Sequence, residues 1–190
     1  MDIVSTQEKQ KMHPHKFTLW VAIGSLIMMF AGLTSAFIVK SNQDKWIPVA
    51  LPMIFWISTG MILLSSLTMQ LSLRSFKDRE MSKYRFLIGV TVVLGAAFII
   101  CQWLGFQQLW EQKVTFKGSG GGQFLYVIFG LHALHVVGGL IVLLIMFIKG
   151  FLGKTKNYSS VPVEVAATYW HFVDALWIYL LVFFLVLGKN

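Results

Sequence analysis

Charged residues are scarce in this sequence, and several long stretches contain none. Only 13% of the 190 residues are Asp, Glu, Lys or Arg, whereas 56% are hydrophobic, and the mean hydropathy is +0.70. A soluble domain has roughly a quarter of its residues charged. This composition therefore excludes an ordinary soluble domain and indicates a membrane protein.

Cysteine is nearly absent as well. The only cysteine, Cys101, lies inside an apolar run. A single cysteine excludes both an intrachain disulfide framework and a CxxC metal site, and we expect Cys101 to pack as a small apolar side chain. No segment resembles a cleaved signal peptide, because the first apolar run begins at Phe17, is long enough to span a membrane and lacks a following cleavage pattern.

Acidic residues are few: the chain has 8 Asp and Glu against 16 Lys and Arg, which gives a net charge of +8. In a soluble protein this excess would suggest nucleic acid as a partner. Here the basic residues fall between apolar runs, where they can face anionic lipid headgroups and set the orientation of the chain. We therefore predict no nucleic-acid partner.

The sequence is rich in long apolar runs. Each of them can cross a ~30 Å hydrocarbon core as a helix that rises ~1.5 Å per residue. The five expected helices cover about residues 17–39, 46–73, 86–110, 124–148 and 166–187. The prediction is a single membrane domain over residues 1–190: an all-α, multi-pass transmembrane bundle with a polar arm at residues 1–16. Residues 111–123, which include a Gly/Ser run, are expected to form a loop.

The basic residues also predict an orientation. The N-terminal arm and the second and fourth gaps between runs contain eleven Lys and Arg, whereas the first and third gaps and the C-terminus contain five. Because cytoplasmic loops carry the excess of positive charge, the N-terminus is predicted to be cytoplasmic and the C-terminus to lie outside. Five spans are consistent with termini on opposite sides.

Two pairs of ionisable residues interrupt the last two apolar runs. They are His132 with His135, and His171 with Asp174. A spacing of three residues puts each pair on one helical face, and all four lie near the middle third of the membrane. Gly139 continues the face of the first pair and permits close approach of a neighbouring helix. A hydrogen bond from a histidine of residues 124–148 to Asp174 is therefore geometrically possible.

Three interpretations of these residues compete. We favour a structural role, in which Asp174 accepts from a histidine and fixes the helix register, because buried polar groups persist by pairing. Alternatively, the group binds a lipid headgroup, a water chain or a proton at the edge of a partner subunit. The third alternative is metal chelation by the three histidines and the aspartate, but an HxxH on one helix is a weak signal. We predict neither a metal ligand nor a catalytic residue.

The same two runs carry motifs in a fixed order. These are Gly-Leu-His-Ala-Leu-His-Val at 130–136, Glu164, Tyr-Trp-His-Phe-Val-Asp at 169–174, and Trp177. In these motifs the sequence resembles subunit III of the haem-copper terminal oxidases, in its shorter bacterial form with five helices. The upstream helices are similar more loosely, through 31–33 and 102–103.

The resemblance implies a non-catalytic subunit of an aerobic respiratory complex in the bacterial inner membrane. The complex as a whole reduces oxygen to water and translocates protons. In the family, haem and copper belong to subunits I and II, and subunit III stabilises subunit I, holds phospholipid in a cleft and supports proton uptake. Contact with other respiratory complexes is left open. The family's polar positions match His132, His135, Glu164, His171 and Asp174.

One feature of the sequence departs from the family. The family commonly has a membrane-embedded glutamate in the helix that matches residues 17–39, but this chain has Ser25 and Leu26 in that region.

Other functions are alternatives to an oxidase subunit. An accessory protein of a nitric oxide reductase would share the five-span plan. A small transporter is disfavoured by the single polar cluster and the lack of an inverted repeat. A stand-alone metalloenzyme is the remaining alternative.

Overall fold

The computed structural model describes residues 14–41, 52–111, 120–152 and 159–187. It contains five helices: α1 (Pro14–Ser41), α2 (Ile54–Lys77), α3 (Met81–Glu111), α4 (Gly120–Leu152) and α5 (Val161–Leu187). All five are long and apolar enough to cross a membrane. The expected all-α, multi-pass transmembrane bundle is therefore confirmed. Residues 1–13 of the predicted arm lie outside the described residues.

The boundary of α4 differs most clearly from the sequence-based expectation. Gly120, Gly121 and Gly122 belong to the helix, although we expected this run to be a loop. A glycine costs about 1 kcal/mol relative to alanine inside a helix. Extending an existing helix by one turn, however, costs much less than nucleating a new one, so the long apolar helix that follows is continued through these glycines.

The beginnings of α2 and α5, which lie near prolines, also differ from the boundaries expected from the sequence. α2 begins at Ile54, after Pro52, whose carbonyl accepts from the Phe55 N–H at 3.1 Å. The expected start at residue 46 and Pro48 lie outside the described residues. α5 begins at Val161 and includes Pro162, where a missing N–H leaves no helical bond unmade.

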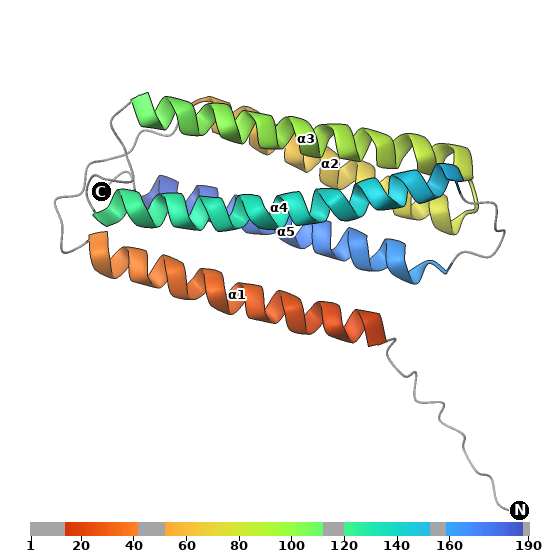
Figure 1. Cartoon of the computed structure of the whole chain (residues 1–190), viewed down its shortest axis with the longest axis horizontal. Coiled ribbons are helices and arrows are strands. Elements are labelled where there is room, and N and C mark those ends of the chain that lie inside the picture. The colour runs from red at the N-terminus through yellow and green to blue at the C-terminus, as the bar shows by residue number, and fades with distance from the viewer. Residues whose placement is uncertain (1–13, 42–51, 112–119, 153–158, 188–190) are drawn as a thin grey trace, which may run out of the picture.

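The helices form three groups in space (Figure 1). α2 and α3 are an antiparallel pair on one side, α4 and α5 lie in the middle, and α1 lies on the opposite side against α4 and α5. A tight turn joins α2 to α3, and in it Arg79 takes a φ of 63°. This order places α5 in contact with α1, α2 and α4.

The α2–α3 contact follows a seven-residue repeat. On α2, buried large side chains at every seventh position alternate with small hydroxyl side chains at Ser58, Ser65 and Ser72. The buried residues of α3 advance by alternating steps of three and four: Tyr84, Ile88, Thr91, Gly95, Phe98, Gln102, Gly105 and Leu109. A 3.5-residue period keeps one seam of each helix facing its partner, as in a coiled coil.

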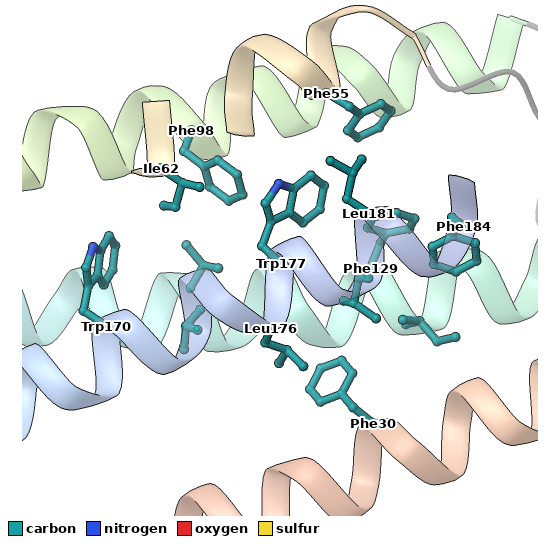
Figure 2. Packing of buried hydrophobic residues seen from close by; sticks show 14 of the residues in the cluster. Phe30, Phe55, Ile62, Phe98, Phe129, Trp170, Leu176, Trp177, Leu181 and Phe184 are labelled. Carbon is teal, nitrogen blue, oxygen red and sulfur yellow. The ribbon is translucent and has the colours of Figure 1, made fainter. Parts of the chain in front are cut away.

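Two tryptophans of α5 fill the centre of the bundle. Trp177 lies among aromatic side chains from α2, α3 and α4 (Figure 2), and its indole N–H donates to Thr59 Oγ1 at 3.0 Å. The Trp170 N–H donates to Ser65 Oγ at 3.1 Å. Gly139 of α4 lies against the Trp170 and Tyr169 rings, which confirms the expected close approach.

A methyl group at Gly95 is predicted to disrupt this core. An added Cβ would lie 2.9 Å from Trp170 Cη2, and that ring is held by Ser65 and by the α4 backbone at Gly139. We expect Gly95→Ala to lower the free energy of unfolding by about 1–3 kcal/mol, as overpacking does. The matched control is Gly60→Ala on α2, where an added Cβ meets open space. Thermal unfolding in detergent measures both, and equal effects would contradict the prediction.

Candidate functional site

His171 is bonded to α2 through both ring nitrogens. Its Nδ1 lies 2.6 Å from Ser66 Oγ, and its Nε2 lies 3.2 Å from Gln70 Oε1. A carboxamide oxygen only accepts, so Nε2 donates to Gln70, and Nδ1 of the neutral ring accepts the Ser66 hydroxyl proton. These three side chains tie the middle of α5 to α2 and fix the tautomer of the histidine.

Asp174 is buried on the same side of α5, with 3% of its surface exposed. Neither carboxylate oxygen has a hydrogen-bond partner within the described residues, although Ser66 is the hydroxyl that faces it. The expected hydrogen bond from a histidine of residues 124–148 to Asp174 is therefore wrong. The physical reason is the rotation of α5, which turns His171 and Asp174 towards α2 rather than towards α4.

The two histidines of α4 have different surroundings. His132 stacks on Trp177 with ring centroids 5.5 Å apart, and the rings of Phe30 and Phe98 approach its edges at 6.5 Å each. His135 Nδ1 donates to the Leu131 carbonyl at 2.6 Å. The two side chains share a helix face and a contact with the Phe30 ring, but within the described residues they share no hydrogen-bond partner.

Glu164 lies apart from the other predicted site residues, in the first turn of α5. Its carboxylate oxygens bind Lys16 Nζ at 2.6 Å and Lys77 Nζ at 3.0 Å. His171 is seven residues further on, about 10 Å along the helix axis. Glu164 therefore joins the beginning of α1 and the end of α2 to the beginning of α5.

The ionisable residues do not converge on a common point. Among residues 14–41, 52–111, 120–152 and 159–187, no group of three or more His, Cys, Asp or Glu side chains is placed to hold a metal ion. The arrangement suits hydrogen bonding between helices. Sequence reasoning missed Ser66 and Gln70, although the hydroxyl residues of α2 were a visible signal for such a seam.

A cleft of about 1310 Å³ opens near the end of the bundle where α1 and α5 begin. Figure 1 shows α1 diverging from α4 towards this end. The inner wall is apolar and includes Gly138, Gly139 and Val142 of α4. The basic side chains that line it come from four segments: His15, Arg79, Arg85 and Lys149. A long apolar wall under a basic rim can accommodate an acyl chain below an anionic headgroup.

The sequence matches a known protein family over nearly its whole length. The model of the family described as cytochrome c oxidase subunit III matches residues 6–189. Cytochrome c oxidase subunit 3 of Bacillus subtilis (strain 168) is 26% identical, over 96% of this chain and 95% of the relative. The subunit 3 of Alkalihalophilus pseudofirmus is 29% identical, over 97% of each chain. That of Bacillus sp. (strain PS3) is 26% identical, over 89% and 84%.

The bond between Ser66 and His171 is predicted to stabilise the bundle. Ser66→Ala removes the donor to Nδ1, and we expect the free energy of unfolding to fall by about 1–2 kcal/mol. The control is Ser72→Ala, because the buried Ser72 hydroxyl has no partner within the described residues, and its loss should be neutral or stabilising. Thermal unfolding of both variants in detergent checks this, and a larger loss for Ser72→Ala would contradict it.

Proposed function

The chain belongs to the cytochrome c oxidase subunit III family, and we propose that it acts as the non-catalytic subunit of its oxidase complex. In this proposal, haem and copper are held by subunits I and II, which reduce oxygen to water, and this chain stabilises subunit I. The chain is a multi-pass protein of the bacterial inner membrane. The observation that carries the proposal is the family match across nearly the whole chain.

The contacts of the ionisable residues support a structural role within the chain. His171 has both ring nitrogens bonded to α2, and Glu164 has both oxygens bonded to lysines of α1 and α2. A general base or nucleophile needs a lone pair available to a substrate. These side chains instead hold three helices in register, which is what a subunit that supports a larger neighbour requires.

The orientation proposed for the chain puts its N-terminus in the cytoplasm. The support is the distribution of basic residues, since the α2–α3 segment alone contains Arg74, Lys77, Arg79, Lys83 and Arg85. In that orientation Glu164 and the mouth of the cleft lie at the cytoplasmic surface.

The cleft is proposed to hold phospholipid. Its apolar wall between α1 and α4 suits an acyl chain, and Arg79, Arg85 and Lys149 suit the phosphate of a headgroup. Arg85 also lies over the Phe151 ring, with 5.4 Å from its guanidinium carbon to the ring centroid, so the cation is held near the rim. Such a lipid would fill the space that α1 leaves against α4.

Affinity purification through a tag on this chain tests the proposed function. We expect co-purification of a haem-containing complex that consumes oxygen, because the haem and copper belong to the partners. The chain expressed without its partners should bind no stoichiometric haem, copper or iron and should consume no oxygen. Metal or turnover in the isolated chain, or a tagged chain that recovers no haem protein, would contradict the proposal.

Obstructing the cleft should reduce bound lipid. Ala22 of α1 lines the cleft, so Ala22→Trp places a large ring where an acyl chain would lie. We expect at least one phospholipid fewer per complex, measured by extraction and quantitative mass spectrometry of the purified oxidase. The control is Val21→Trp, at an exposed neighbour that does not line the cleft. Equal phospholipid content in the two variants would rule out a lipid at this position.

A further inference from the structure

The indole bonds between α5 and α2 also fix what surrounds Asp174. Trp170 and Trp177 lie on either side of Asp174 along α5, and both donate to hydroxyl groups of α2. Residues 60–64 of α2, between those hydroxyl groups, carry no hydroxyl, amide or charged side chain. The hydroxyl that faces the Asp174 carboxyl is that of Ser66. Both carboxyl oxygens lack a completed hydrogen bond within the described residues, so the polar contact open to them is Ser66.

The single proton of the Ser66 hydroxyl is already committed to His171. Nε2 of the ring lies 3.2 Å from the carboxamide oxygen of Gln70, which only accepts, so Nε2 carries the ring proton. Nδ1 of the neutral ring is then an acceptor, and Ser66 Oγ lies 2.6 Å from it. Ser66 therefore presents Asp174 with a lone pair. An ionised carboxylate, which only accepts, gains no hydrogen bond there, whereas a protonated carboxyl can donate.

No cation faces Asp174 within the described part of the chain. Asp174 is 3% exposed, so it is enclosed by protein rather than by water. α5 itself has no lysine or arginine, and α1, α2 and α3 carry no charged or histidine side chain in residues 17–39, 54–73 and 86–110. α4 contributes His132 and His135, and neither makes a hydrogen bond to Asp174. A carboxylate enclosed without a cation or donors is strongly unfavourable, and such a group takes up a proton instead.

We propose that Asp174 is a proton-holding site, whose carboxyl is protonated in the folded protein and donates to Ser66 Oγ. The hydrogen bonds then run in one direction, from Asp174 to Ser66 to His171, and from His171 to Gln70. Moving the acid proton through Ser66 to His171 would keep the same number of hydrogen bonds. It would also bury a carboxylate and an imidazolium, so the uncharged arrangement is favoured in this apolar surrounding. This inference depends neither on the proposed role in an oxidase nor on lipid in the cleft.

Infrared difference spectroscopy of the purified complex at neutral pH tests the protonation of Asp174. Subtracting the Asp174→Asn spectrum from the wild-type spectrum cancels the carboxyl groups of every other residue. We expect the difference to contain the C=O stretch of a carboxylic acid, which moves to lower frequency when aspartate carries a heavy carbon isotope at its carboxyl. Carboxylate stretches in place of that band would overturn the proposal, because they would show an ionised Asp174.

Ser66→Ala gives a second measurement, in complexes that retain Asp174. Removing the acceptor frees the acid O–H, so we expect the same C=O band to move to higher frequency rather than to disappear. Ser72→Ala, on the same helix, is the control and should leave the band unchanged, because the Ser72 hydroxyl has no partner within the described residues. An unshifted band in Ser66→Ala, or a shift of the same size in Ser72→Ala, would refute the bond to Ser66.

Discussion

The indole N–H groups of Trp170 and Trp177 impose the constraint on which the bundle depends. In an apolar surrounding a buried donor must find an acceptor, and a tryptophan offers only this one polar atom. The acceptors are Ser65 and Thr59 of α2, so the two bonds fix both the rotation of α5 and its position along α2. Gly95 and Gly139 complete the arrangement, because only glycine leaves room for the Trp170 ring between α3 and α4.

The number of helices could be predicted from the sequence because charge-free length alone decides whether a segment spans the membrane. Their ends were less predictable. Gly120 to Gly122 are predicted to be a loop from their glycine content, yet they are helical, because extending the long helix that follows by one turn needs no new nucleation. Residue propensity, which ignores the neighbouring helix, therefore misled the prediction at this boundary.

The candidate site could be predicted only in part from residue spacing. A spacing of three residues correctly placed His171 and Asp174 on one face of α5, but spacing carries no information on which neighbour that face meets. The rotation of α5 is set by its tryptophans, so the polar pair meets Ser66 and Gln70 of α2. The hydroxyl residues of α2 are visible in the sequence as hydrogen-bonding groups. Pairing them with the two indole N–H groups would have predicted that this side of α5 meets α2.

The distribution of ionisable groups along the membrane normal limits how this chain could assist proton uptake. The region of α1 that resembles the family's embedded-glutamate segment has Ser25, which is exposed on the outside of the bundle and carries no titratable proton near neutral pH. Within the described residues, the histidine and carboxylate side chains at membrane depth are on α4 and α5, and the carboxylate, Asp174, is enclosed. A carboxylate that exchanges protons with water must be accessible and must not be held in its ionised form, and both oxygens of Glu164 at the mouth of the bundle are paired with lysines. Both acidic side chains of α5 are therefore committed to the chain itself, since Asp174 is enclosed between helices and Glu164 is held by lysines of α1 and α2.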